Sequence, residues 1–283
     1  MKSRFPDLTF FIDAAGRYSH SKEVPIVFAG LAVETSAVNE IRESLLASTK
    51  GHLFKWSKAT GTKECSPSIF RLLGKRQLLG AVRVVWKNTP EWNRYFDEGQ
   101  RLYEKGVKKA QEPIPFAKPM ATFKLHQFSL VCGDLIGLYA RRHRNWLPKK
   151  HLPVQPIEVA AVFDSDIHGE ANQRVCKNVF AQIEGSLTQT QKYLRLRPKI
   201  KVDIKTEQED PLLLLADHLA GYHYSRRAYD SQKEGEWQDL LEAVEPLVGK
   251  LPPNCYQITE EPFRERYLLS SATFDRILPK KAK

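Results

Sequence analysis

The chain has 283 residues, 42% of them hydrophobic, which is enough to bury a large core in one elaborated domain. No stretch approaches the roughly 18 consecutive apolar residues of a membrane span, and the amino terminus lacks the apolar core of a signal peptide. We therefore expect a soluble, cytoplasmic protein that has no membrane partner. The formal net charge of +11 favours a polyanion such as nucleic acid as the partner, although basic runs can also be solvated surface.

The four cysteines argue against both a zinc site and a disulfide framework. They lie far apart and form no C-x-x-C pair: Cys65, Cys132, Cys176 and Cys255. In a cytoplasmic protein such cysteines are expected to stay reduced.

The first half of the chain predicts three strands and several helices. Apolar runs rich in β-branched and aromatic residues predict strands at residues 8–12, 24–33 and 81–87. Helical spacing follows at residues 36–48, 66–80 and 90–110, and in the second of these Ser66 would be the N-cap and Pro67 would lie in the first turn. A proline-rich loop then leads to about residue 120. We interpret residues near 36–80 and near 88–120 as insertions.

The second half predicts a long buried helix at residues 121–144 and two strands, at 157–163 and 198–204, separated by a helix near 171–190. A further helix starts at Asp210 and Pro211 and runs from Leu212 to about Tyr224, because Asp caps a helix and proline is tolerated in the first turn. Residues near 230–283 are expected to form a helical extension. The whole chain, residues 1–283, is expected to be a single domain.

Three aspartates stand at positions where a charge is costly. Asp13 and Asp164 each end an apolar strand, and Asp217 lies on a helix face that it shares with leucines and small residues. If the two strands are parallel neighbours, both carboxylates emerge at one edge of the sheet. Carboxylates held so close repel unless a cation compensates them, and oxygen-only clusters suit Mg²⁺ or Mn²⁺. The alternative for Asp217 is that it caps a neighbouring loop.

The stretch "FKWSK" places Lys55 and Lys58 on either side of Trp56. The lysines are predicted to hold a phosphate and the tryptophan to stack on a base. The alternative is a surface loop that Trp56 anchors to the core.

The order "FFIDAAG", "FKWSK", "VFDSD" and "PLLLLADHLAG" resembles the family called domain of unknown function 3800, which is related to the RNase H-like superfamily. The resemblance covers residues 8 to 225, and the matching positions are Asp13, Lys55, Ser57, Asp164, Ala216 and Asp217. Ala14 and Ala15 stand where the family has Glu and Ser, and Leu214 stands where it often has Gln. The resemblance implies an α/β, RNase H-like fold: a mixed five-stranded sheet of three antiparallel and two parallel strands, flanked by helices and carrying helical insertions.

In that superfamily a carboxylate from the helix before the fourth strand often completes the site. Asp134 is the acidic residue of that predicted helix, and its alternative is an ion pair with Arg141 or Arg142. Asp166 and Asp210 are weaker candidates, and Asp210 is more simply a helix cap. Three histidines, His168, His218 and His223, could assist proton transfer, but none is selected as a site residue.

The predicted function is a metal-dependent nuclease that hydrolyses phosphodiester bonds of DNA or RNA. Its catalytic aspartates would be Asp13, Asp164, Asp217 and Asp134, of which the first three would hold two Mg²⁺ or Mn²⁺ ions. The alternative is a non-catalytic nucleic-acid-binding or complex-forming protein with the same fold. The absence of the family's Glu at position 14 favours this alternative.

Overall fold

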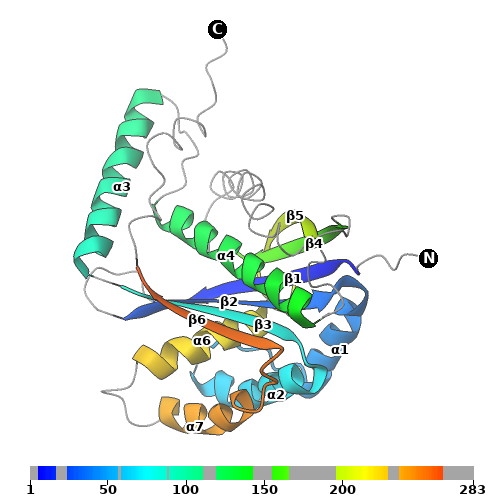
Figure 1. The fold of residues 1–283 in the computed structure, drawn as a ribbon. Helices are drawn as coiled ribbons and strands as arrows, with labels where there is room; N and C mark the ends of the chain where they lie inside the picture. Colours follow the sequence, from blue (N-terminus) through cyan, green and yellow to red (C-terminus); the bar gives the residue numbers. More distant parts are fainter. Residues whose placement is uncertain are drawn as a thin grey trace.

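The computed structural model describes residues 6–16, 24–56, 59–87, 89–110, 119–142, 155–165, 196–228 and 236–263. These residues form a mixed sheet of six strands with helices on both faces (Figure 1). The strand order is β5-β4-β1-β2-β3-β6. The strands are β1 (Leu8–Ala15), β2 (Pro25–Glu34), β3 (Leu79–Trp86), β4 (Gln155–Asp164), β5 (Leu196–Lys205) and β6 (Tyr256–Pro262).

The sheet contains the expected combination of antiparallel and parallel strands. β1 pairs antiparallel with β2, and β2 pairs antiparallel with β3. β4 lies parallel to β1 on the other side, and β5 lies parallel to β4. The three early strands and the two later ones therefore have the arrangement that the family resemblance implies.

The expected number of strands and the expected helical extension both need correction. β6 lies parallel to β3 as a sixth strand, in the part of the chain where we predicted only helix. β6 is an edge strand with the sequence YQITEEP, and alternate residues of it are exposed. An edge strand that is half exposed has no continuous apolar run, so the pattern that predicts buried strands does not detect it.

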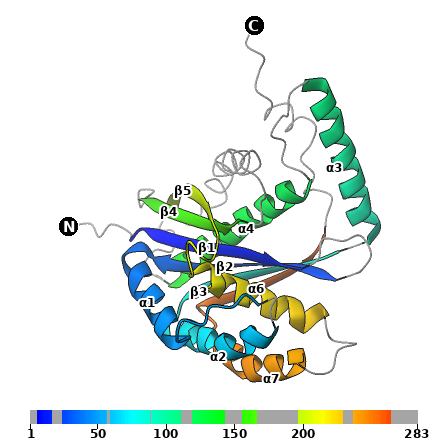
Figure 2. The ribbon, with the colours of Figure 1, turned by 180° about the vertical axis from the view of Figure 1, so that it is seen from behind.

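The described helices cover both faces of the sheet (Figures 1 and 2). One face carries α4, which contacts β1, β2 and β3; the other carries α6, which contacts β1 and β2, with α2 and α7 packed together beyond it. The helices are α1 (Val38–Ser48), α2 (Ala59–Arg76), α3 (Thr89–Ala110), α4 (Pro119–Arg142), α6 (Leu213–Ala228) and α7 (Glu236–Val248). The helix predicted near 171–190 lies outside the described residues.

The predicted start of α2 is wrong. The helix begins at Ala59, so Ser66 and Pro67 lie inside it. Ser66 is buried, and its hydroxyl is 2.7 Å from Nδ1 of His218 on α6. Its side chain therefore joins two helices and does not cap one.

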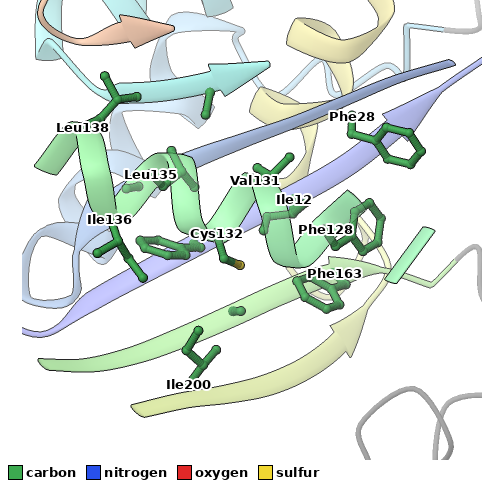
Figure 3. Packing of buried hydrophobic residues seen from close by; sticks show 14 of the residues in the cluster. Ile12, Phe28, Phe128, Val131, Cys132, Leu135, Ile136, Leu138, Phe163 and Ile200 are labelled. Carbon is green, nitrogen blue, oxygen red and sulfur yellow. The ribbon is translucent and has the colours of Figure 1, made fainter. Parts of the chain in front are cut away.

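The core lies on both faces because successive strand residues point to opposite sides. On the α4 face, Ile12, Phe28 and Phe163 pack against Val131 and other apolar residues of the helix (Figure 3). On the α6 face, a second cluster includes Phe11, Val27 and Ala29 of the sheet and the leucines of α6. The two clusters fix the orientation of every residue of β1 and β4, including those at the strand ends.

Two expectations from composition can be compared directly with the structure. Cys65, Cys132 and Cys255 are free and buried, while Cys176 lies outside the described residues. In the described part of the chain, no helix has the length and hydrophobicity needed to cross a membrane.

Candidate active site

Asp13 and Asp164 lie side by side at the carboxyl ends of β1 and β4. The register of these parallel strands pairs Ile12 with Phe163, so the next residue of each strand lies at the same level. Ile12 and Phe163 belong to the core on the α4 face, and alternation therefore turns both aspartates toward the α6 face. Asp13 is 4% exposed and Asp164 3%. The Oδ1 atom of each accepts a hydrogen bond from the backbone N–H of the residue that follows it, at 2.6 and 2.7 Å respectively.

Glu207 brings a third carboxylate to the same place. β5 pairs with β4 so that Lys205, its last residue, lies opposite Asp164, and Glu207 follows two residues later. One carboxylate oxygen from each of Asp13, Asp164 and Glu207 lies within 4.8 Å of the other two. Sequence reasoning did not select Glu207. The signal that could have found it is the one that found the aspartates, a carboxylate just past the end of a parallel strand.

Lys55 places an ammonium group among these carboxylates. Its Nζ lies 3.8 Å from Oδ2 of Asp164 and contacts Oε1 of Glu207. Burial lowers the pKa of Lys55, but the hydrogen bond to Glu207 and the charges of Asp164, Glu207 and Asp13 raise it by more, so the pKa is above its ordinary value. Lys55 is therefore charged and compensates part of the negative charge.

Trp56 fixes the segment that carries Lys55 to α6. Its indole is 4% exposed, and its Nε1–H donates a hydrogen bond to Oγ of Ser225 at 2.8 Å. Gly221 makes room for it, because a Cβ on residue 221 would lie 2.1 Å from Cγ of Trp56. Burial of the indole contradicts the predicted stacking on a base and agrees with the alternative, a loop anchored by tryptophan.

Asp217 lies within range of the charges of Glu207 and Asp164. Its Oδ2 accepts the backbone N–H of Trp56 at 2.7 Å. The pKa of Asp217 is raised to about 7, chiefly by burial; Glu207 and Asp164 also raise it, while the Trp56 hydrogen bond and Lys55 lower it. Among the described residues, Asp217 does not belong to the group whose oxygens lie within 4.8 Å of one another. Its hydrogen bond fits the alternative prediction of a residue that caps a neighbouring loop.

His218 holds the same segment from the next position of α6. Its Nε2 lies 2.7 Å from the carbonyl oxygen of Phe54, and its Nδ1 lies 2.7 Å from Oγ of Ser66. Burial lowers the pKa of His218 to about 4, although the hydrogen bond to Phe54 opposes this. A neutral imidazole that donates to Phe54 from Nε2 accepts from the Ser66 hydroxyl at Nδ1. Sequence reasoning did not select His218, since no local pattern shows that residue 54 lies against α6.

Asp134 is not brought to this site. It lies on α4, across the sheet from Asp13, and its Oδ2 accepts a hydrogen bond from Nη1 of Arg83 at 2.7 Å. Nη2 of Arg83 donates to Oε1 of Glu261 at 2.9 Å. Burial raises the pKa of Asp134, against the lowering effect of Arg83. The alternative of an ion pair therefore describes Asp134, with Arg83 as the bonded partner in place of Arg141 or Arg142.

Of the two weaker aspartate candidates, the structure describes Asp210. Several other residues named from the sequence lie outside the described part. Asp210 is a cap, as the simpler interpretation has it: its Oδ1 accepts the N–H of Leu212 at 3.4 Å, and it pairs with Arg42 at 3.3 Å. Four residues lie outside the described ranges: Ser57, Lys58, Asp166 and His168.

The chemistry of the three-carboxylate group fits a hard divalent cation. Asp13, Asp164 and Glu207 supply only oxygen, the donor that Mg²⁺ and Mn²⁺ prefer. Two of the three are almost fully buried, and buried charges are paired or coordinate metals. Among the described contacts, the ammonium of Lys55 compensates part of the charge of Asp164 and Glu207.

Comparisons with known proteins add little to this description. No family model matches the sequence, and no curated protein matches it. A solved structure described as the PCNA:RNase HII complex from Archaeoglobus fulgidus is similar over 95% of this chain and 99% of the matched chain. The identity is 15% and the TM-score is 0.35.

Proposed function

We propose that this protein is a metal-dependent nuclease with an RNase H-like fold, which hydrolyses phosphodiester bonds of DNA or RNA. The observation that carries the proposal is the group of three carboxylates at the carboxyl ends of β1, β4 and β5, which are adjacent parallel strands. The order of β1 to β5 supports it, because this is the arrangement that the family resemblance implies. The net charge of +11 suits a polyanionic substrate.

In this proposal Asp13, Asp164 and Glu207 hold Mg²⁺ or Mn²⁺. Such a cation supplies Lewis-acid polarisation of a phosphoryl oxygen and lowers the pKa of bound water. Lys55, in the segment before α2, reaches the same place and would donate to a phosphate oxygen through its ammonium group. Asp217 serves by holding the backbone of Trp56, and Asp134 has no part in the reaction.

A second candidate is the non-catalytic nucleic-acid-binding protein with the same fold. The observation that favours it is the position of Lys55, whose ammonium already compensates Asp164 and Glu207. In such a protein the lysine would take the place of the metal, and the carboxylates would stabilise the fold of the binding protein.

A cleavage assay distinguishes the two candidates. The full chain is incubated with single-stranded and duplex RNA and DNA in Mg²⁺, in Mn²⁺ and in chelator. Asp13→Asn and Glu207→Gln each remove one ligand charge and nearly preserve shape, and both should abolish cleavage. Glu43→Gln is the matched control, because Glu43 is an exposed carboxylate on α1, which supplies no site residue.

Metal binding is measured separately, by the rise in melting temperature that each cation produces. A ligand that binds only the folded state at about 100 times its Kd stabilises it by about 2.7 kcal/mol. The wild type and Glu43→Gln should show this rise, and Asp13→Asn should lose it. Cleavage that survives chelator or either site variant would overturn the proposal. Binding of nucleic acid by an inactive wild type, without a metal-induced rise, would establish the second candidate.

A further inference from the structure

The outer strand of the sheet presents a row of basic side chains on the face that carries the carboxylates. Ile200, Val202 and Ile204 of β5 turn toward the core on the α4 face. The alternate residues, Arg197, Lys199, Lys201 and Asp203, point the other way and are exposed. We call Arg197, Lys199 and Lys201 the β5 basic face.

No described helix packs over this part of the sheet. α6 lies on β1 and β2 and has few contacts with β4 (Figure 2). The β4 residues opposite the basic face are also accessible to solvent: Pro156 and Ala160 are exposed, and Glu158 is half-buried. Ala160 lies opposite Lys201, so the β4 side chain that faces this lysine is a methyl group. As far as the described helices are concerned, this surface can take a ligand that lies flat on the sheet.

The charge of this surface is positive. Lys199 lies 3.5 Å from Glu158, and Lys205, at the end of β5, lies 3.6 Å from Asp203. Both pairs are in contact with solvent, where ion pairs neutralise little and compete poorly with a polyanion. Counted along β5 and the facing residues of β4, Arg197 and the three lysines outnumber Glu158, Asp164 and Asp203 by one.

The β5 basic face leads to the candidate active site. Lys205 is paired with Asp164 in the sheet register, and Glu207 follows two residues later. Alternate side chains of a strand are about 6.6 Å apart, so Lys201 lies about 13 Å from the level of Asp164. A chain of phosphates laid along β5 would therefore arrive at the carboxylates.

We propose that the β5 basic face binds the phosphate backbone of a nucleic-acid strand and directs that strand to Asp13, Asp164 and Glu207. The inference rests on the proposed function for its destination, whereas binding on β5 requires no catalysis. Charged residues on an edge strand have another use, since lysines prevent edge-to-edge pairing with other sheets. The two explanations differ in one respect: protection from pairing requires no affinity for nucleic acid.

The experiment measures binding of a labelled single-stranded oligonucleotide by fluorescence anisotropy, in chelator and over a series of salt concentrations. The test variant combines Arg197→Gln, Lys199→Gln and Lys201→Gln. The matched control combines Arg71→Gln, Lys75→Gln and Lys250→Gln, three exposed residues on or just after α2 and α7. Both variants lose three positive charges, so they differ only in where the charge was. Melting curves confirm that each is folded.

Three lost phosphate contacts should reduce the slope of log K against log salt by about 2, since each contact contributes about 0.7 for a single strand. The control should keep a slope close to that of the wild type. Lys201→Gln alone should reduce the slope by about 0.7. This single variant is the test if the triple variant does not fold. Glu158→Gln removes a negative charge from the same surface and should raise the affinity.

Equal losses in the test and control variants would show that binding follows total charge, and would overturn the inference. Unchanged binding in the test variant would also overturn it and leave protection of the sheet edge as the role of these residues. If only the test variant loses binding and the wild type cleaves no nucleic acid, the result would support binding on the β5 basic face and refute the proposed hydrolysis.

Discussion

Gly221→Ala tests the close contact between α6 and the segment that carries Lys55. A Cβ built on residue 221 would lie 2.1 Å from Cγ and 2.3 Å from Cδ1 of Trp56, far inside van der Waals contact. The indole must therefore move. Trp56 is held by two hydrogen bonds: its indole Nε1–H donates to Ser225 at 2.8 Å, and its backbone N–H donates to Asp217 at 2.7 Å. Movement of Trp56 strains both bonds.

The expected loss of stability follows from two opposing effects. Overpacking a well-packed core costs about 1–3 kcal/mol, and the rigid, buried indole places this substitution at the upper end. Replacing glycine by alanine inside a helix returns about 1 kcal/mol. The net loss is about 2 kcal/mol. An unfolding entropy of about 2.1 cal/mol/K for each of the 283 residues converts this into a fall in Tm of about 3 °C.

Thermal melting of two glycine variants checks this value. Gly137→Ala makes the same chemical change in α4, where the new Cβ would meet Nη1 of Arg141 at 3.5 Å, an ordinary contact. This variant should gain only the stability that alanine adds to a helix relative to glycine, which raises Tm by about 1–2 °C. A rise for Gly221→Ala equal to that for Gly137→Ala would refute the close contact between α6 and Trp56.

Three further predictions concern the same site without metal. Burial raises the pKa of Asp217 to about 7, so the stability it contributes when protonated is lost as the pH rises from about 4 to about 7. Asp217→Asn should therefore melt above the wild type at about pH 8, and melting at about pH 5 should show a smaller difference. Lys55→Met removes the positive charge beside Asp164 and Glu207, which should cost about 1–2 kcal/mol in chelator and enlarge the stabilisation by Mg²⁺ measured in the same melts. Ser225→Ala leaves the buried Nε1–H of Trp56 without its acceptor and should cost about 1–3 kcal/mol, measured by denaturant unfolding; an unchanged midpoint would contradict the role of this bond.

The buried strands could be predicted from the sequence because their signal is local. β1, β2 and β3 are apolar runs with a buried residue at nearly every position, and β4 ends in a buried run from Ala161 to Asp164. The parallel and antiparallel pairings were expected from the family resemblance, and the sheet has them. β6 has no such run, because half of its side chains face solvent and β3 supplies its pairing. The stability of that strand comes from its place in the sheet, which its own residues do not encode.

A site residue could be predicted only where the sequence shows both a carboxylate and the apolar strand that ends at it. Asp13 and Asp164 each follow an apolar run, so the cost of the charge is visible from the neighbouring residues. Glu207 lies in the polar stretch TEQED just past a predicted strand, a position that points equally to Glu207, Glu209 and Asp210 until the course of the chain past β5 is known. Asp134 shows the reverse difficulty: its helix packs on the opposite face of the sheet, which periodicity alone does not reveal.

The sequence places the charge of Asp217 on a packing face of α6. In the structure, its hydrogen-bond partner is a backbone group. Asp217 accepts the N–H of residue 56, and its neighbour His218 contacts the carbonyl of residue 54. The two bonds fix the backbone on either side of Lys55, whose ammonium then reaches Asp164 and Glu207. α6 therefore acts on the carboxylates through Lys55 as well as through the charge of Asp217. Asparagine at position 217 keeps an acceptor for residue 56 and removes the charge, so any effect of Asp217→Asn on metal binding reports the charge alone.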